Sequence, residues 1–314
     1  MPRFGADGSY GGEGATALKS FALDMRVPWP PPSPHDEVDV GELAVLLRSL
    51  REKPTPPILP GTTGAGIVHG VDISGWQPNA KIDFQELAED GVRFAYVKAS
   101  EGLSTTKSFG DHWADLRSVG ILRGGYHFAS FKGERKRQPQ EQADAFLRAL
   151  EKVDGTFGEL RPALDAEWQY FGKGDAGKKA READMGVNYR LFPARAVIDW
   201  CHEFGHRVLE VTGLLPLLYT GNSFWKYRLA STDELVAWAL WQAAYRGDGH
   251  EIPIDEWPTS MTPPWEKVTV WQHTGKGRLF DGDGDGRIAY AENIDRNAYR
   301  GTEEDLVREI GLAA

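Results

Sequence analysis

Cysteine is nearly absent from the sequence: Cys201 is the only one in 314 residues, so no disulfide can form within the chain. The expected fold therefore does not depend on an oxidising compartment. Long apolar runs are also missing, and no stretch reaches the roughly 20 residues that a membrane-spanning helix needs. The N-terminal segment lacks the apolar core of a signal peptide, which predicts synthesis in the cytoplasm without a secretory leader.

Basic residues are too few for a typical nucleic-acid-binding protein. The chain has 36 Lys and Arg against 46 Asp and Glu, a formal net charge of -10, whereas such proteins usually display a basic stripe. Hydrophobic residues make up 41% of the chain, enough for a sizeable core. We therefore expect a folded protein with no nucleic-acid partner and no membrane span. The negative charge is compatible with a polysaccharide substrate.

Residues 1–66 differ in composition from the rest of the chain. Two Pro-rich stretches, 27–34 and 54–60, flank a segment from Val38 to Lys53 whose leucines recur at helical spacing. One amphipathic helix between two stiff linkers cannot bury its own apolar face. It either docks on the main domain or binds an unknown partner. The predicted organisation is an N-terminal extension, 1–66, followed by one barrel domain, 67–314.

After residue 66, short apolar runs typical of strands alternate with helix-length segments. The predicted strands are 67–74, 94–100, 122–130, 162–168, 215–221, 236–245 and 268–274. The predicted helices are 82–90, 111–119, 140–153 and 194–212. This alternation predicts parallel strands with helical crossovers. The expected fold is α/β, an irregular TIM-like β/α barrel with regular β/α units first and strands without full helices at its end. Residues 169–193 are predicted to form an insertion loop.

Ionisable and polar aromatic residues follow the predicted strands at the ends where barrel enzymes place their active sites. Asp72 follows the first strand, Glu101 the second and Tyr126 the third, while Asp165 and Glu167 end the fourth. One such residue would be ordinary in a polar loop. Together they predict a catalytic site at the carboxyl-terminal rim of the barrel.

The spacing of Asp165 and Glu167 has a chemical consequence. Side chains two residues apart lie on the same face of a strand, with Cβ atoms ~6–7 Å apart. Because two carboxylates at this distance do not ionise independently, one of them is expected to keep its proton near neutral pH. A proton donor beside an anion is what the cleavage of a glycosidic bond requires.

Eight segments resemble family 25 of the glycoside hydrolases, the muramidase group that includes many bacteriophage endolysins. In chain order they are GVDISGWQ (70–77), FAYVKASEG (94–102), GGYHF (124–128), ALDAEW (163–168), LLYTGNSFW (217–225), LWQAAY (240–245), VWQHT (270–274) and NIDRNAY (293–299). The resemblance implies an irregular β/α barrel that hydrolyses the β-1,4 bond between N-acetylmuramic acid and N-acetylglucosamine.

The resemblance also implies roles for single residues. Glu167 matches the general acid, and Asp165 matches a partner that holds or polarises the N-acetyl group of the substrate. The further substrate-binding residues that it implies are Asp72, Glu101, Tyr126, Trp241, Trp271 and Asp295. The two tryptophans are candidates for rings that stack on sugars, with a place in the core as the alternative for each. Glu101 has an alternative role in hydrogen bonding within the barrel.

A second motif, DGDGDGRIAYAE, covers residues 281–292. Its spacing matches the twelve-residue EF-hand loop, with carboxylates at positions 1, 3, 5 and 12 and glycine at position 6. The expected ligands of Ca²⁺ are Asp281, Asp283, Asp285, the backbone carbonyl of Arg287 and Glu292. A single loop of this kind predicts a structural ion. Because Glu292 precedes Asp295 closely, the ion is expected to help place Asp295. No organic cofactor is expected.

The function predicted from the sequence is that of a lysozyme from a phage or prophage, with bacterial peptidoglycan as its partner. Such a protein is made in the cytoplasm and acts on the cell wall after release or as part of a phage particle. Two alternatives remain: another glycosidase such as a chitinase, which also uses an Asp-x-Glu pair, and a non-catalytic wall-binding protein that has kept the barrel.

Overall fold

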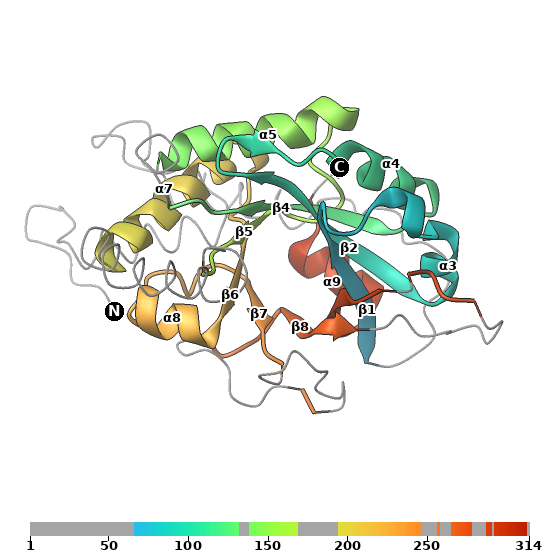
Figure 1. Ribbon diagram of the computed structural model, residues 1–314. Coiled ribbons are helices and arrows are strands. Elements are labelled where there is room, and N and C mark those ends of the chain that lie inside the picture. The colour runs from blue at the N-terminus through green and yellow to red at the C-terminus, as the bar shows by residue number, and fades with distance from the viewer. Residues whose placement is uncertain are drawn as a thin grey trace, which may run out of the picture.

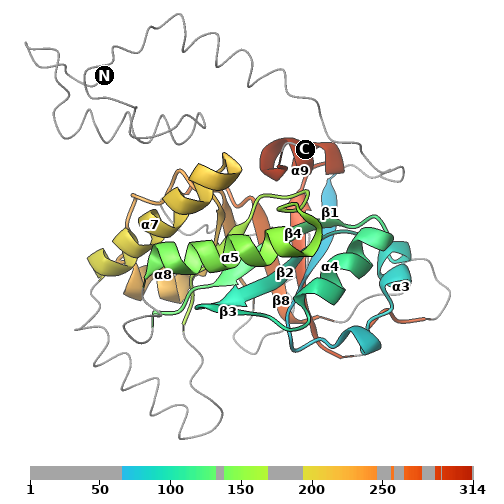
Figure 2. The same ribbon diagram turned by 90° about the horizontal axis from the view of Figure 1, so that it is seen from above.

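A computed structural model of the protein describes residues 66–131, 138–168, 194–245, 256–257, 265–277, 287–290 and 292–312. Most of the N-terminal extension and the insertion loop at 169–193 lie outside these ranges. The described residues form a strand barrel surrounded by helices (Figures 1 and 2). None of the described helices is long and apolar enough to cross a bilayer.

Eight strands close the barrel, and one short strand extends it. The barrel strands are β1 (Ile67–Ile73), β2 (Val92–Glu101), β4 (Leu122–Phe128), β5 (Ala163–Asp165), β6 (Leu217–Gly221), β7 (Leu240–Ala243), β8 (Val270–Gly277) and β9 (Ile294–Arg300). The pairing of β1 with β2 closes the sheet, and β3 (Ser104–Thr105) forms a hairpin with the end of β2. Neighbouring strands of the eight-stranded barrel are parallel except that β9 is antiparallel to both β8 and β1.

Helices cover the outside of the barrel in its first part (Figure 1). They are the 3-10 turn η1 (Asn79–Lys81), α3 (Phe84–Glu89), α4 (Phe109–Ser118), α5 (Pro139–Asp154), α7 (Ala194–Thr212) and α8 (Asn222–Arg228). The last helix, α9 (Glu303–Ile310), instead packs Leu306, Val307 and Ile310 against the inner core of the barrel. The two long helices α5 and α7 pack side by side (Figure 2). The predicted irregular β/α barrel is therefore confirmed, and β9 shows that the last part of the barrel departs from the regular pattern.

Helix α5 shows how local sequence sets an element. Pro139 occupies the first turn, where its missing N–H leaves no hydrogen bond unmade, and Gly155 ends the helix with φ of 75°. Between them, Ala143, Phe146 and Leu150 recur every three or four residues and are buried. Because these residues share one face of the helix, α5 presents an apolar stripe to the sheet.

Alternation along the strands separates two layers of core. Inward-facing residues such as Phe94, Tyr96 and Leu217 fill the barrel, while outward-facing residues such as Val97 and Leu164 pack against the helices. Two inward glycines make room for the large rings. A Cβ at Gly70 would lie 2.4 Å from the Phe94 ring, and one at Gly124 would lie 2.3 Å from the Tyr96 ring.

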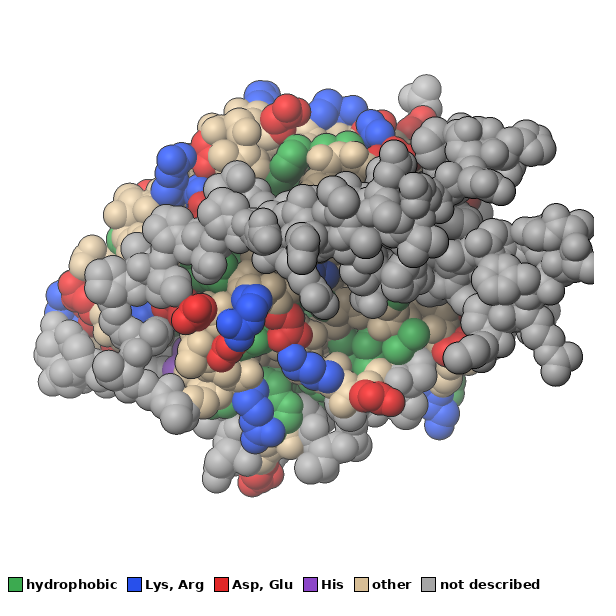
Figure 3. All heavy atoms as spheres, turned by 180° about the vertical axis from the view of Figure 1, so that it is seen from behind, with side chains coloured by type: hydrophobic (Ala, Val, Ile, Leu, Met, Phe, Trp, Pro, Cys, Tyr) green, Lys and Arg blue, Asp and Glu red, His purple; other side chains and the backbone are tan. Residues whose placement is uncertain are grey.

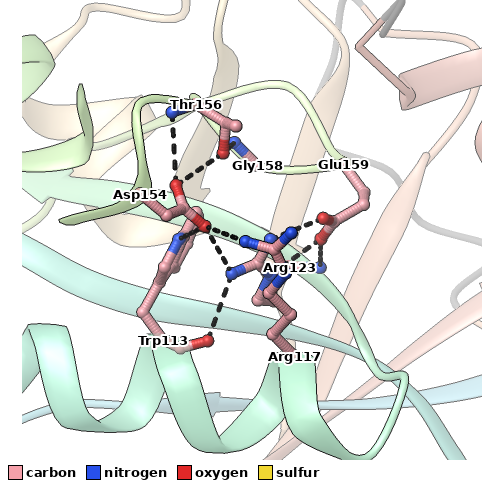
Figure 4. Close-up of polar contacts among 7 residues, drawn as sticks. All are labelled: Trp113, Arg117, Arg123, Asp154, Thr156, Gly158 and Glu159. Carbon is pink, nitrogen blue, oxygen red and sulfur yellow. Dashed lines mark hydrogen bonds and ion pairs between the residues drawn. The ribbon is translucent and has the colours of Figure 1, made fainter.

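An ion-pair cluster joins α4, β4 and α5 at the start of β4 (Figure 4). This end of the barrel is opposite the carboxyl-terminal ends of the parallel strands. Arg123 is 2% exposed, donates to Asp154 at 3.0 Å and to Glu159 at 2.6 Å, and stacks on the ring of Trp113. Arg117 also contacts Asp154, at 3.3 Å, but is 63% exposed. Elsewhere, on the face drawn in Figure 3, the described Lys and Arg side chains are interspersed with Asp and Glu.

Candidate active site

The residues predicted for the centre of the site gather at one rim of the barrel, where β1, β4 and β5 end. Asp165 ends β5 and Glu167 follows it, while Leu164 and Ala166 belong to the outer core, between the barrel and the helices. Asp165 and Glu167 thus lie on the same face, as the sequence predicted. Because β9 is antiparallel to its neighbours, Asp295 near its start lies at the same rim and is the register partner of Asp72 on β1.

Four acidic groups share this rim. Asp72, Asp165, Glu167 and Asp295 all contribute to the raised pKa of the buried Tyr126 hydroxyl, after the effect of its burial. Tyr126 itself is 8% exposed and points into the barrel from β4. The structure therefore brings together the five residues that the sequence singled out for the centre of the site.

Burial and neighbouring negative charges raise the pKa of both members of the Asp-x-Glu pair. For Glu167, burial followed by the negative charge of Asp72 raises the pKa to about 7. For Asp165, burial followed by the charge of Glu167 raises the pKa well above its usual value. Because both pKa values are raised and two close carboxylates do not ionise independently, one proton is retained between them near neutral pH.

Asp165 has an oxygen that faces no hydrogen-bond donor. The residue is 6% exposed, and within the described part of the chain its Oδ1 atom is buried without a hydrogen-bond partner. A buried acceptor left unpaired costs free energy, on the order of 1–3 kcal/mol. Such an atom is suited to accept an N–H or O–H group from a ligand.

Side chains in the barrel interior hold the Asp72 carboxylate by hydrogen bonds. Its Oδ2 atom accepts hydrogen bonds from Gln272 Nε2 at 2.9 Å and from Asn297 Nδ2 at 2.8 Å. It also shares a hydrogen bond with Asp295. The pKa of Asp72 is raised by burial, and these hydrogen bonds oppose the increase. Neither amide was predicted from the sequence as part of the site.

The two tryptophans do not lie where the sequence predicted. Trp241 is 2% exposed and packs inside the barrel against Tyr96, Tyr126 and Tyr219. Trp271 is fully buried in the outer core, and its Nε1 donates to the carbonyl of Ala244 at 2.8 Å. Rings that are covered on all sides cannot stack on a sugar in this conformation, so the prediction of a stacking role is wrong for both.

Lys98 is a cation at the site that sequence reasoning missed. It faces inward on β2, and its Nζ lies 2.7 Å from Glu101 Oε2. Its positive charge lowers the pKa of both Asp165 and Glu167, against the larger effect of burial. Glu101, half-exposed at the rim, pairs with Lys98 and contributes to the raised pKa of Asp165. The sequence could have indicated this role, because Lys98 falls on the same face of the strand as the inward residues Phe94 and Tyr96.

Tyr245 was also missed, although it ends the LWQAAY motif. The ring is 40% exposed, and burial together with the charges of Glu167 and Asp295 raises the pKa of its hydroxyl to about 12. A Cβ atom on Gly275 would lie 3.6 Å from Tyr245 Cζ and 3.4 Å from Asp295 Oδ1. Tyr245 therefore places an accessible aromatic ring beside the acidic groups, which Trp241 and Trp271 do not.

The predicted calcium ligands fall only partly within the described residues. Asp281, Asp283 and Asp285 lie outside them. The Arg287 guanidinium contacts Asp83 and Glu86 at 3.1 Å each, and Glu292 pairs with Lys81. Within the ranges that the structure describes, no three acidic, His or Cys side chains form a group that could hold a metal. The calcium site stays a prediction.

Comparison with known proteins agrees with the fold. Residues 71–282 match the family model described as glycosyl hydrolases family 25. The chain belongs to this family. It is 30% identical over 227 residues to the N,O-diacetylmuramidase of Arthroderma benhamiae, covering 70% of this chain and 82% of that protein. A family 25 chain is a glycoside hydrolase, and the acidic rim is where its chemistry is expected.

Solved structures share the fold. The bacterial lysozyme from Streptomyces coelicolor superposes with a TM-score of 0.56 at 23% identity, covering 79% of this chain and 97% of that chain. The catalytic domain of endolysin ply40 from bacteriophage P40 of Listeria monocytogenes gives a TM-score of 0.54 at 24% identity, covering 79% of this chain and 98% of that chain. Both support the irregular barrel described above.

Proposed function

We propose that this family 25 hydrolase is an N-acetylmuramidase, which cleaves the β-1,4 bond between N-acetylmuramic acid and N-acetylglucosamine in bacterial peptidoglycan. The observation that supports it most is the pair at the end of β5. Glu167 has a pKa raised to about 7, and Asp165 beside it has a buried oxygen without a hydrogen-bond partner in the described part of the chain. The muramidase name of the fungal relative supports the choice of substrate.

Glu167 acts as the proton donor in this proposal. A carboxylic acid that stays protonated to about pH 7 can protonate the glycosidic oxygen as its bond to C1 breaks. The proton then leaves with the product alcohol, and Glu167 becomes a carboxylate. In the second half of the reaction that carboxylate takes a proton from water, and the water oxygen adds to C1.

Asp165 acts on the N-acetyl group of the same sugar. Its unpaired Oδ1 is suited to accept the amide N–H, which aims the acetyl oxygen at C1 and increases its electron density. That oxygen forms a bond to C1 as the glycosidic bond breaks, and water later opens the resulting ring. Asp165 therefore serves only sugars that carry an N-acetyl group, which both peptidoglycan and chitin contain.

Product analysis on two polymers separates the candidate functions. Purified protein is incubated with peptidoglycan and with chitin, and the new reducing ends are identified after borohydride reduction. Muramic-acid ends from peptidoglycan are the expected result. Release of chitin fragments instead would assign the protein as a chitinase, and no product from either polymer would support a non-catalytic wall-binding role.

The biological setting that we propose is that of a phage or prophage lysin, made in the cytoplasm and reaching the wall after release or on a phage particle. Its support is a fold shared with the catalytic domain of a phage endolysin. To test this setting, the protein is produced by inducing the prophage or by phage infection. Antibodies then detect whether it is present in the particles and in the medium after lysis. The N-terminal extension is then a candidate for binding a partner on the particle.

We also propose a structural calcium ion in the loop 281–292, supported by its EF-hand spacing. Glu292 is 56% exposed and pairs with Lys81, so calcium and Lys81 would compete for the same carboxylate. Lys81→Met is expected to tighten calcium binding measured by calorimetry, and Glu292→Gln to weaken it. Unchanged heats in the wild type on adding calcium, with no effect of a chelator on melting temperature or activity, would contradict the site.

A further inference from the structure

Asp72 receives one hydrogen bond from an amide whose orientation is fixed. Trp241 Nε1 donates to Asn297 Oδ1 at 2.7 Å, and Asn297 Nδ2 donates to Asp72 Oδ2 at 2.8 Å. An indole N–H can only donate, so the oxygen of Asn297 must face Trp241 and its NH₂ group must face Asp72. Asn297 is fully buried.

A second amide, on the neighbouring strand β8, reaches the same oxygen atom. The Tyr219 hydroxyl donates to Gln272 Oε1 at 2.9 Å, and Gln272 Nε2 donates to Asp72 Oδ2 at 2.9 Å. Gln272 is 4% exposed and Tyr219 is 7% exposed. Both amides therefore present N–H donors to one carboxylate oxygen, an arrangement that favours the ionised form of Asp72.

Asp295 completes the arrangement. Asp72 and Asp295 are hydrogen-bonded to each other, and two ionised carboxylates would repel, so the pair holds one proton. We propose that Gln272 and Asn297 are positioning residues that keep the negative charge on Asp72 and the proton on Asp295. Trp241 and Tyr219 act through them by orienting the two amides.

The charge held on Asp72 faces ionisable groups from several strands. Asp72 contributes to the raised pKa values of four of them. These are Asp165 at the end of β5, Glu167 just beyond it, Tyr126 on β4 and Tyr245 after β7. Lys98 on β2 acts on Asp165 and Glu167 in the opposite direction. For Glu167 and Tyr126, Asp72 is the largest influence on the pKa after burial.

The positioning residues thus act on the proton donor at a distance. Because the two amides stabilise the charge on Asp72, they also help Glu167 to stay protonated at neutral pH. This inference rests on the proposed function in so far as Glu167 is the acid of the reaction. The ionisation of Asp72 and Asp295, by contrast, is a property of the free protein and can be measured without substrate.

The test replaces each amide by an apolar residue of similar size, in the variants Gln272→Met and Asn297→Leu. Without a donor, Asp72 binds a proton more readily and less negative charge faces Glu167. The basic limb of the pH profile of kcat/KM on peptidoglycan is expected to move down by about half a pH unit or more in each variant. Tyr219→Phe, which loses one oxygen and keeps its ring, is expected to move it in the same direction by less.

Gln142→Met is the matched control. Gln142 is fully buried on α5 and bonds His127 and the backbone of Ser130, outside the acidic rim. Loss of the Gln142 amide is expected to lower the melting temperature and to leave the basic limb of the pH profile where it is in the wild type. If the limb also stays in place in Gln272→Met, Asn297→Leu and Tyr219→Phe, the amides are merely structural and the proposal is wrong.

Carboxyl ¹³C NMR of protein labelled at aspartate keeps the test independent of the substrate. In the wild type, one carboxyl of the Asp72–Asp295 pair is expected to remain ionised to lower pH, and Asp72→Asn identifies it. Gln272→Met and Asn297→Leu are expected to raise that titration midpoint. A midpoint unmoved in both would overturn the positioning role, whereas a wild-type protein inactive on peptidoglycan would overturn only the proposed function.

Discussion

Asp72 on β1 and Glu167 beyond the end of β5 are coupled across the mouth of the barrel. The negative charge of Asp72 adds to burial in raising the pKa of Glu167 to about 7. A carboxyl group with the usual glutamate pKa would be almost fully ionised at neutral pH and could not donate a proton. The acidity of the site is thus set by residues far apart in the chain.

Asp72→Asn tests this coupling. The acid form of Glu167 is required for activity, so activity is lost as pH rises through its pKa. Removing the charge at position 72 lowers that pKa, and the basic limb of kcat/KM is expected to fall from about 7 by about one pH unit. The control is Glu141→Gln, the same change of charge at an exposed position on α5, where salt screens its effect. A limb that moves equally in both variants would contradict the coupling.

Tyr245 is expected to bind a sugar ring. It is 40% exposed beside Asp295, and we take the contact of its ring with a sugar to be worth about as much as that of an aromatic pair, about 0.5–1.5 kcal/mol. Tyr245→Ala should therefore raise KM on peptidoglycan by up to about tenfold with a smaller effect on kcat. Tyr245→Phe keeps the ring and should bind nearly as well as the wild type. A KM that rises as much in the Phe variant would assign the effect to the hydroxyl group instead.

Arg123 is expected to stabilise the end of the barrel opposite the site. It is 2% exposed and bonded to both Asp154 and Glu159, so Arg123→Met leaves two acids without their shared partner. The loss in free energy of unfolding should be about 3–5 kcal/mol. Arg117→Met removes a 63% exposed partner of the same Asp154 and should cost less than about 1 kcal/mol. Urea denaturation of the two variants compares these values, and equal losses would contradict the assignment.

Strand–helix alternation and the acidic strand ends were sufficient to predict the barrel and its rim. Those features depend on local periodicity, which is why Asp165 and Glu167 were placed correctly on one face. Depth within the barrel is different, because it depends on how eight strands are staggered. Trp241 faces inward, as the substrate-binding prediction required, but it lies among Tyr96, Tyr126 and Tyr219 rather than at the surface.

The partners of Asp72 could not be predicted for a related reason. Gln272 and Asn297 reach Asp72 from strands far along the chain, and the direction of β9 decides that Asp295 lies opposite Asp72. No local pattern in the sequence gives that direction. Lys98 is the exception. The sequence places it on the same inward face of β2 as its apolar neighbours, and a charged side chain is unusual in a barrel interior.

His127 predicts how stability depends on pH. The ring is fully buried, with Nε2 2.9 Å from Gln142 Oε1 and Nδ1 2.8 Å from Ser100 Oγ, and burial lowers its pKa to about 4. In the unfolded chain the pKa is about 6.5. Between these values only the unfolded state gains a proton, so the free energy of unfolding decreases as pH falls from about 6.5 to 4, by roughly 3 kcal/mol in total.

Denaturation in urea at pH 7 and pH 4.5, for the wild type and for His127→Gln, measures this contribution. The buried acids at the rim have raised pKa values and act in the opposite direction, so the informative quantity is the difference between the two proteins. The variant is expected to be less stable than the wild type at pH 7 and to lose less stability on acidification. Parallel curves would mean that His127 titrates alike in the folded and unfolded states.

The role of Glu167 as proton donor is tested most directly by changing the leaving group of the substrate. Glu167→Gln is compared with the wild type on peptidoglycan and on a dinitrophenyl glycoside of the N-acetylglucosamine–N-acetylmuramic acid disaccharide, whose leaving group needs no protonation. The variant is expected to lose about 10²–10⁴-fold in kcat/KM on peptidoglycan and far less on the activated glycoside. Equal losses on both substrates, or full activity on peptidoglycan, would contradict the assignment of Glu167.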